Sequence, residues 1–333
     1  MSEKINDYFF SDESDESDNE KKIDTQIDDK DIKKECDVQI EEEETIVGID
    51  LGTSNSCISI WKNQNLEIIP DHKGKRTTPS VVSFTNKSIY VGTEAKNQME
   101  LNSENTYYDS KRLIGRKFKD QHVQNELEYL SYGIKEDEKE GIVFTCGLSN
   151  RKDEYTPEEI SAMILMKLKH QAENFLRKPI RKAVVTIPAY FNDSQRQATK
   201  DAIHIAGLEA VRILHEPTAA ALAYGYEKAT IKDGSNLVVL VYDLGGGTLD
   251  VSLLVIEKGM FQVIGSSGNT HLGGEDFDNR IYKYALREFK RKNNIQKLTN
   301  IQTISLQKLR KQCELAKRTL TTESRTVIAV KDF

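Results

Sequence analysis

The fold is decided by Leu237-Val238-Val239-Leu240-Val241-Tyr242-Asp243-Leu244-Gly245-Gly246-Gly247-Thr248, because a shorter form of this stretch also occurs near the start of the chain. The earlier form is Ile46-Val47-Gly48-Ile49-Asp50-Leu51-Gly52-Thr53. In both, an apolar run ends in Asp-Leu-Gly, and a second apolar run follows, at 57–61 or 251–255. This pattern predicts two β-hairpins with tight turns made of Gly, Thr and Asp.

The two turns carry residue types that hold a metal-bound polyphosphate. Asp50 and Asp243 directly follow apolar strands, so the backbone fixes them while their carboxylates reach a cleft. Magnesium prefers oxygen ligands and keeps several of its waters, which suits carboxylates that act partly through water. Glycines let backbone N–H groups approach phosphate oxygens, and hydroxyls add further donors. These residues are Gly245, Gly246, Gly247, Thr53, Ser54 and Thr248.

Ordinary hairpin turns also favour Asp and Gly, so one copy alone would not indicate a binding site. Two matching copies, each between two strands, favour a phosphate clamp. The chain has no G-x-x-x-x-G-K-[ST] stretch, which excludes a P-loop nucleotidase, and the three glycines lack the spacing of a dinucleotide site.

Charge divides the 333 residues into two parts. Residues 1–44 have 18 acidic and 6 basic side chains, and the remainder has a net charge of +6. The acidic segment cannot bury enough apolar surface to offset its ordering entropy, so we predict a disordered tail. A solvated tail is the simpler interpretation, and a docking segment is the alternative. Ser17, three residues before Glu20, is a candidate for phosphorylation by an acid-directed kinase.

Composition also argues against several classes of protein. Lys and Arg are scattered without a basic run or an aromatic platform, so we expect no nucleic-acid partner. The four cysteines lie far apart without C-x-x-C spacing, which fits a reducing compartment. The longest apolar run is too short to cross a membrane, and the acidic N-terminus does not match a secretory signal. We therefore expect a cytoplasmic or nuclear protein without membrane partners.

Helix and strand signals alternate between the two hairpins. Thr156-Pro157-Glu158-Glu159 predicts a helix start with a capping box, and Pro179 its end; apolar residues that recur on one face of this helix, the last of them Phe175, predict its buried side. Asn192 or Asp193 predicts the start of a second helix, which Gly207 ends. With strands at 183–187 and 210–214, this order predicts an α/β fold with crossover helices, and the repeated hairpin predicts two similar lobes around a cleft.

Six stretches together resemble the heat-shock protein 70 family, in that family's order, over residues 45–333. They are Asp50-Leu51-Gly52-Thr53, Lys111-Arg112-Leu113-Ile114-Gly115-Arg116, Val185-Thr186-Ile187-Pro188-Ala189-Tyr190-Phe191-Asn192-Asp193-Ser194-Gln195-Arg196, Glu216-Pro217-Thr218-Ala219-Ala220-Ala221, Asp243-Leu244-Gly245-Gly246-Gly247-Thr248 and His271-Leu272-Gly273-Gly274-Glu275-Asp276-Phe277-Asp278. The resemblance implies an α/β actin-like ATPase fold with two lobes around a nucleotide cleft. It divides the chain into a disordered acidic tail at 1–44, lobe I at 45–228 and an incomplete lobe II at 229–333.

The resemblance also implies roles for individual residues. Lys111 would place its ammonium group beside the γ-phosphate and the attacking water, where a fixed cation neutralises charge. Glu216 would act near the metal and phosphates, and Thr248 would contact the γ-phosphate. Asp50, Asp243 and Asp250 would hold Mg²⁺ through its waters, and we count Asp243 also among the catalytic residues. The residues implied to bind ATP or ADP are Gly52, Thr53, Ser54, Asn55, Lys111, Gly245, Gly246, Gly247, Thr248, Gly273, Gly274, Glu314, Lys317, Arg318 and Thr321.

The last four of these belong to residues 313–321, which are similar to the family's adenosine-contacting helix. The alternative is an amphipathic helix whose charged residues are solvated. Its inward residues would be Leu309, Cys313, Ala316 and Leu320.

The chain ends before segments that complete lobe II in the family, including one that closes over the adenine. The interdomain linker, the peptide-binding domain and the helical lid are also absent. Residues 326–330 predict a strand that lacks its following partners. If the 333 residues are the complete protein, we expect weakened ATP affinity and poor stability.

The expected function is that of an ATP-binding, ATP-hydrolysing chaperone module. Its partners would be J-domain co-chaperones and nucleotide-exchange factors, with unfolded polypeptide bound only through the domain that this chain lacks. The alternative is a non-catalytic interaction module that binds the same co-chaperones. A small-molecule kinase of the same superfamily is a weaker option, because the stretches at 189–191 and 216–217 match the chaperone branch.

Overall fold

The computed structural model describes residues 44–148, 154–227, 237–257, 260–294 and 303–331. Its largest sheet runs in the order β12-β11-β1-β2-β3, and β4 pairs with β2. β1 lies parallel to β11 and antiparallel to β2, and β11 lies parallel to β12. These strands are β1 (Ile46–Asp50), β2 (Asn55–Lys62), β3 (Asn65–Ile68), β4 (Thr78–Pro79), β11 (Lys182–Ile187) and β12 (Glu209–His215).

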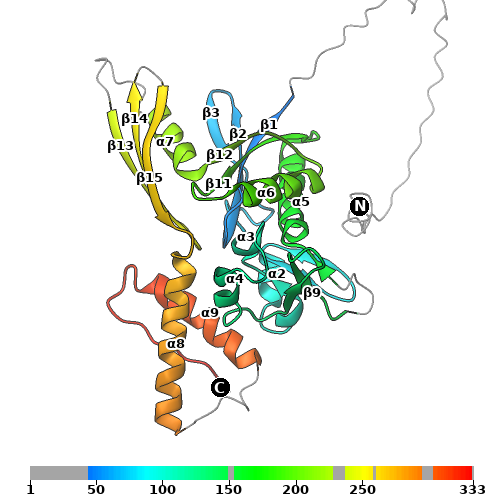
Figure 1. Ribbon diagram of the computed structural model, residues 1–333, viewed down its shortest axis with the longest axis vertical. Helices are drawn as coiled ribbons and strands as arrows, with labels where there is room; N and C mark the ends of the chain where they lie inside the picture. Colours follow the sequence, from blue (N-terminus) through cyan, green and yellow to red (C-terminus); the bar gives the residue numbers. More distant parts are fainter. Residues whose placement is uncertain (1–43, 149–153, 228–236, 258–259, 295–302, 332–333) are drawn as a thin grey trace, which may run out of the picture.

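Alternate residues of the central strands form the core of this sheet. Val47 and Ile49 of β1 and Ile58 of β2 are buried, as the period of two along a strand requires when one face is covered. α5 (Pro157–Leu176) packs against β2, and α6 (Asp193–Ile205) packs against α5 and β12 (Figure 1). The strand–helix order that predicted an α/β fold is confirmed.

The predicted capping box at Thr156 is present, and the second predicted helix also begins with a capping box, at Asn192. Thr156 caps α5 through its Oγ1, which accepts a hydrogen bond from the Glu159 amide at 3.2 Å. Asn192 does the same for α6, and Gly207 follows that helix with a φ of 67°. α5 stops at Leu176, before the predicted Pro179, because Arg177 adopts a left-handed conformation that ends the helix.

Below the main sheet lie two small sheets with an aromatic core (Figure 1). Tyr107 is fully buried, and its ring centroid lies 5.5 Å from that of Phe84 and 5.2 Å from that of Phe144. The stretch 119–139, which has only a weak pattern, contains both a helix and a strand of this region. Its elements are α2 (Thr93–Gln98), α3 (Ser110–Leu113), α4 (Gln121–Glu126), the 3-10 helix η1 (Ser103–Asn105), β5 (Val82–Phe84), β6 (Ile89–Val91), β7 (Thr106–Tyr107), β8 (Ile134–Glu136), β9 (Ile142–Thr145) and β10 (Glu154–Tyr155).

The second half of the chain forms an antiparallel sheet and two long helices. The sheet is β13 (Leu237–Leu244), β14 (Leu249–Glu257) and β15 (Met260–Asn269). α7 (Glu216–Glu227) connects the two halves, because it packs against β11 and β12 as well as β13 and β14. α8 (Gly274–Asn293) follows β15, and α9 (Thr303–Thr319) packs against it (Figure 1).

Three details of the sequence prediction are wrong. Residues 326–330 form no strand, since no described strand pairs with them, and Val327 is 83% exposed. Phe175 and Leu320, both predicted on buried helix faces, are exposed because one lies in the last turn of α5 and the other just after α9.

The predicted tail at 1–44 lies outside the described residues except for Glu44, and so does the predicted lobe boundary at 228/229. In the described part of the chain, no helix has the length and apolarity needed to cross a membrane.

Candidate functional site

The tips of the two predicted hairpins touch each other. Gly246 lies so close to the first tip that a Cβ atom on it would fall 2.0 Å from Ser54 Oγ. A Cβ on Gly247 would fall 2.9 Å from Thr53 Oγ1 and equally close to Arg112 Nε. The sequence prediction explains these glycines by phosphate binding, and the structure gives another reason for them, which is the close approach of the two loops.

Within the second half of the chain, the start of α8 packs against the glycine turn of the second hairpin. The β13–β14 turn is closed by the Gly245 amide, which donates to Thr248 O at 2.9 Å. The first amides of α8 then donate to this turn, Gly274 to Gly245 O at 3.0 Å and Glu275 to Gly246 O at 2.9 Å. A Cβ on Gly273 would fall 2.3 Å from Gly246 O. The helix start therefore attaches directly to the glycine turn.

The first hairpin is equally tight at its turn. The Gly52 amide donates to Ser56 Oγ at 3.1 Å, and a Cβ on Gly52 would fall 2.0 Å from Asn55 O. Ser54 Oγ donates to Glu275 Oε1 at 2.5 Å, across from one half of the chain to the other. Asn55 begins β2 and is exposed.

The three predicted metal-binding carboxylates lie at these hairpin tips. Asp50 accepts a hydrogen bond from Thr186 Oγ1 at 3.0 Å. Asp243 stands directly opposite Asp250 in the β13–β14 register. Asp250 is buried, and its Oδ1 accepts from the Ala189 amide at 3.1 Å, whereas its Oδ2 has no hydrogen-bond partner among the described residues.

Lys111 and Glu216 form a buried ion pair beside these carboxylates. Lys111 Nζ lies 2.5 Å from Glu216 Oε1, and the two side chains are 8% and 14% exposed. Lys111 comes from α3, and Glu216 is the first residue of α7. The two predicted catalytic side chains are therefore in direct contact.

The carboxylates at the hairpin tips influence the charge state of this ion pair. Burial raises the pKa of Glu216, Lys111 opposes that rise, and the charges of Asp50 and Asp243 add to it. Burial likewise raises the pKa of Asp243, followed by the charges of Asp250 and Asp50. Carboxylates from both halves thus repel one another in one partly buried space, which a bound cation would relieve.

The donor set fits a hard, hydrated cation. It consists of carboxylate oxygens, including the unpartnered buried Oδ2 of Asp250, and oxygen is the ligand that magnesium prefers. Within the described residues, no three His, Cys, Asp or Glu side chains converge closely enough to bind a metal directly. Binding through metal-bound waters is the arrangement that suits this spacing.

Two of the four predicted adenosine residues contact neighbouring elements. Lys317 Nζ donates to Gly274 O at 2.8 Å and to Asp278 Oδ2 at 2.7 Å. Glu314 pairs with Lys96 of α2 at 3.0 Å. These contacts place α9 beside the glycine turn that starts α8. Arg318 and Thr321 are exposed.

Arg112 is the residue that the sequence reasoning missed. Its side chain is 2% exposed, and it bonds to Glu126 Oε1 at 2.8 Å and to Asp276 Oδ2 at 2.9 Å. Glu126 belongs to α4 and Asp276 to α8, so this guanidinium ties the two halves together. A Lys-Arg pair in a sequence normally indicates solvated charge, so nothing local predicts that Arg112 is buried among acids from α4 and α8.

A stacked pair of histidines makes a further contact between the halves. The rings of His122 and His271 lie 4.1 Å apart with an interplanar angle of 19°. Burial, then the neighbouring His122, Arg116 and Arg112, lower the pKa of His271 to about 4. His271 is therefore neutral at physiological pH.

Comparison with known proteins agrees with this geometry. The family model described as Hsp70 protein matches residues 46–332. The chain belongs to the Hsp70 family. The resemblance seen in the six sequence stretches is thereby confirmed, and so is the predicted actin-like α/β fold class.

Individual members of the Hsp70 family are similar to this chain over most of its length. Heat shock 70 kDa protein 2 of Paracoccidioides lutzii is 49% identical over 284 residues, which are 85% of this chain and 42% of the relative. Heat shock cognate 70 kDa protein 3 of Dictyostelium discoideum is 48% identical over 86% of this chain and 45% of its own length. The heat shock protein 70 homolog of Acanthamoeba polyphaga mimivirus is 48% identical over 88% of this chain and 32% of its own length. The chain spans less than half the length of these relatives.

Replacement of Arg112 tests its role between the halves. Arg112→Met leaves the buried carboxylate of Glu126 without its cation, so we expect a loss of about 3–5 kcal/mol in the free energy of unfolding, measured from urea denaturation. Lys119→Met is the control, because Lys119 pairs with Glu136 at the surface and is 76% exposed; its midpoint should not move. Equal midpoints for both variants would contradict the assignment.

His271 gives a prediction about pH. Its lowered folded pKa means that the unfolded chain binds a proton more readily between pH 6.5 and 4, so wild-type stability falls as the pH drops through that window. His271→Gln removes this contribution, and its Tm should fall less from pH 7 to pH 5 than the wild-type Tm, by roughly 3 °C, in scanning calorimetry. The exposed His204 supplies the control, since His204→Gln should keep the wild-type slope.

Proposed function

We propose that this Hsp70-family chain binds MgATP and hydrolyses it as the nucleotide-driven part of a chaperone. The observation that supports this most is the convergence of Asp50, from the first hairpin, and Asp243, from the second, on the Lys111–Glu216 pair. A half-buried set of acids with one lysine is what a metal-bound triphosphate and its attacking water require.

In this proposal the glycine turns and the hydroxyls of Thr53, Ser54 and Thr248 bind the phosphates. Gly273 and Gly274 extend the same surface at the start of α8. Glu314, Lys317, Arg318 and Thr321 bind the adenosine. Magnesium, when bound, neutralises phosphate charge, and the residues that would hold it through waters are Asp50, Asp243 and Asp250.

Lys111 and Glu216 act on the reaction itself. Lys111 Nζ transfers its contact from Glu216 to a γ-phosphate oxygen and so neutralises charge that grows in the transition state. Glu216, whose pKa burial raises, is left to orient the attacking water and accept its proton at Oε1. The new bond forms between the water oxygen and phosphorus as the bond to the bridging oxygen breaks, which gives ADP and phosphate.

Hydrolysis can then act on partners through the angle between the halves. A nucleotide drives such a change only if it binds the two arrangements with different affinity, and the contacts across the cleft, among them Ser54–Glu275 and Arg112–Asp276, provide the means. J-domain co-chaperones and exchange factors are the proposed partners, in the cytoplasm or nucleus. Unfolded polypeptide would bind to a region of the family that these 333 residues do not include.

Replacement of Lys111 tests the enzymatic part of this proposal. Lys111→Ala should lower the rate of phosphate release from ATP by about 10²–10³-fold, the usual cost of losing one preorganised transition-state contact. Lys117→Ala, at a lysine that is 63% exposed, should keep the wild-type rate in the same assay. If wild type and Lys111→Ala release phosphate equally slowly while J-domain binding persists, the chain is instead a non-catalytic interaction module.

A further inference from the structure

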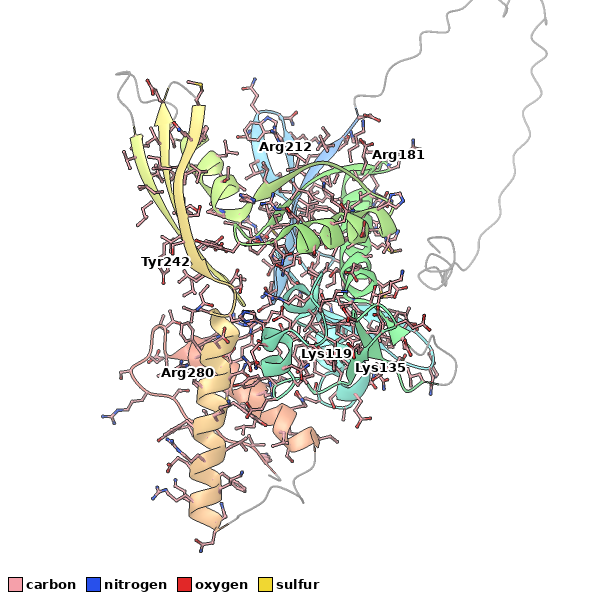
Figure 2. The ribbon with its side chains drawn as sticks, viewed as in Figure 1. Lys119, Lys135, Arg181, Arg212, Tyr242 and Arg280 are labelled. Carbon is pink, nitrogen blue, oxygen red and sulfur yellow. The ribbon has the colours of Figure 1, made fainter. Side chains whose placement is uncertain are left out.

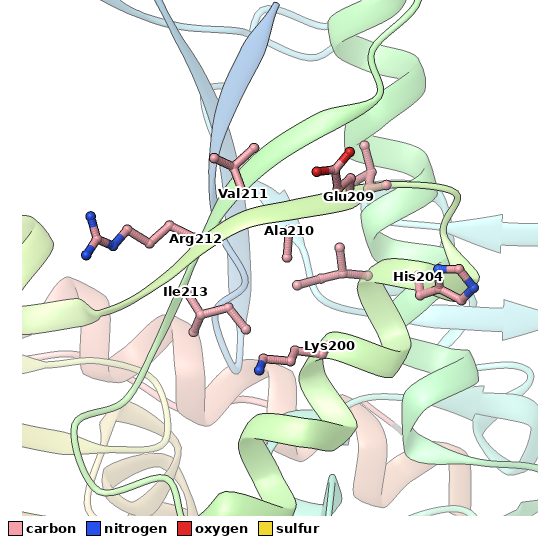
Figure 3. Close-up of a pocket in the computed structure, with 9 residues that line it drawn as sticks. Lys200, His204, Glu209, Ala210, Val211, Arg212 and Ile213 are labelled. Carbon is pink, nitrogen blue, oxygen red and sulfur yellow. The ribbon is translucent and has the colours of Figure 1, made fainter.

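A hollow of about 450 Å³ lies between α6 and β12 (Figure 3). Its lining is mixed and includes the apolar side chains of Ile203, Leu208 and Ile213, and Figure 3 shows Ala210 and Ile213 pointing from the strand toward the helix. β12 is an edge strand of the main sheet, so its outer backbone groups are available for pairing. None of these residues belongs to the proposed nucleotide site.

Two cations lie on the lining of this hollow. Lys200 and Arg212 are exposed, and neither forms an ion pair with any described residue. Arg177, Lys178 and Arg181, exposed between α5 and β11, are likewise free of ion pairs within the described part of the chain, and the Arg181 carbonyl accepts a hydrogen bond from the Glu209 amide at 2.7 Å. The surface therefore carries unpaired positive charge beside the apolar side chains of the hollow.

Glu209 is the acidic residue of the lining. It stands opposite Lys182 in the β11–β12 register, and Lys182 forms an ion pair with Glu44. The two cations of the lining, Lys200 and Arg212, therefore outnumber its one carboxylate.

The N-terminal segment of this chain leaves the main sheet beside the hollow. Ile46 stands opposite Lys182, and Lys182 stands opposite Glu209. Neighbouring strands are about 4.8 Å apart, so the exit point of residues 1–43 is about 10 Å from Glu209. Figure 2 shows Arg181 and Arg212 at the same end of the molecule as the start of β1.

The sequence of that N-terminal segment complements the hollow. Tyr8-Phe9-Phe10 supplies three adjacent aromatic residues, and Ser11-Asp12-Glu13-Ser14-Asp15-Glu16-Ser17-Asp18 follows directly with five acids. The 25 residues from 19 to 43 span roughly 25–30 Å as a flexible chain, which exceeds the distance to the hollow. Tethering gives the segment an effective local concentration in the millimolar range.

We propose that residues 8–18 of this chain dock in the hollow between α6 and β12, with an aromatic side chain inside it and the acidic run along the unpaired cations Lys200, Arg212, Arg177, Lys178 and Arg181. Docking buries aromatic surface and pairs free charges of opposite sign. It also covers the β12 edge, so this segment competes with any partner that approaches there. Phosphate on Ser11, Ser14 or Ser17 adds negative charge and strengthens the contact.

Other exposed surfaces fit this segment less well. The outer face of β13 exposes Val238, Leu240 and Tyr242 (Figure 2), but the described strands of that sheet carry no Lys or Arg to pair with the acids. The end of α8 is basic at 290–292, but it lies at the opposite end of the molecule from the start of β1, where the segment leaves the sheet (Figure 1). Only the α6–β12 surface, among the described residues, combines both features with the exit point of the segment.

Photo-crosslinking in the full-length chain tests the proposal. p-Benzoylphenylalanine in place of Phe9 should crosslink on irradiation to residues 200–213, as mapped by mass spectrometry. Because the contact is intramolecular, the yield should not change over a tenfold range of protein concentration. It should fall when salt rises from 50 to 500 mM, which shortens the range of charge pairing.

A charge-reversed pair supplies the discriminating variant. Lys200→Glu with Arg212→Glu should lower the crosslink yield at least fivefold, whereas Lys290→Glu with Lys292→Glu on α8 should leave it unchanged. Circular dichroism and the thermal midpoint verify that both variants fold; if the first does not, Asp12→Asn with Glu13→Gln, Asp15→Asn and Glu16→Gln should give the same loss. Crosslinks elsewhere on the chain, crosslinks only between molecules, or a yield that survives charge reversal would overturn the proposal.

Discussion

Repulsion among four carboxylates in one partly buried space is the constraint on which the rest of the structure depends. Asp50, Asp243, Asp250 and Glu216 come from two separate sheets and α7, and a single lysine partly neutralises them. Burial raises the pKa of the last three, and the charges of neighbouring carboxylates add to that rise for Glu216 and Asp243, so the arrangement costs free energy in the absence of a cation. Such strain is expected where a site is built for a charged ligand rather than for stability.

Contacts near the cleft hold these charges together despite that cost. Arg112 pairs with acids from α4 and α8, and the missing Cβ atoms of Gly246 and Gly247 let the two hairpin tips touch. The amides at the start of α8 then fix the second tip. The Arg112–Asp276 pair and the contact between the hairpin tips join the two halves, so the position of one half relative to the other and the state of the carboxylates are coupled.

Much of the fold follows from local sequence signals. The hairpins around Asp50 and Asp243, the capping boxes at Thr156 and Asn192, and the stop at Gly207 all depend on neighbouring residues, and all are present. The prediction of a strand at 326–330 was wrong because a strand needs a neighbouring strand for its backbone hydrogen bonds, and a local sequence pattern does not show whether one is present. Phe175 and Leu320 are exposed although helix periodicity places them on apolar faces, because periodicity does not show how far along a helix the element packed against it extends.

The candidate site was predictable in its residue types but not in its internal partners. The duplicated hairpin indicated the carboxylates and glycines, and the family resemblance indicated Lys111 and Glu216. Nothing in the sequence showed that these two side chains pair with each other, or that Arg112 is buried, because both facts depend on contacts between residues far apart in the chain. The stacked His122 and His271 were missed for the same reason.

The most direct test of the central claim is isothermal titration calorimetry of ATP with the full chain, in magnesium and in EDTA. If the hairpin carboxylates share one metal-bound nucleotide, ATP should bind in magnesium, bind at least tenfold more weakly in EDTA, and lose the magnesium effect in Asp50→Asn and Asp243→Asn alike. ATP affinity that is the same with and without magnesium, or that responds to one of these two substitutions and not to the other, would contradict the account.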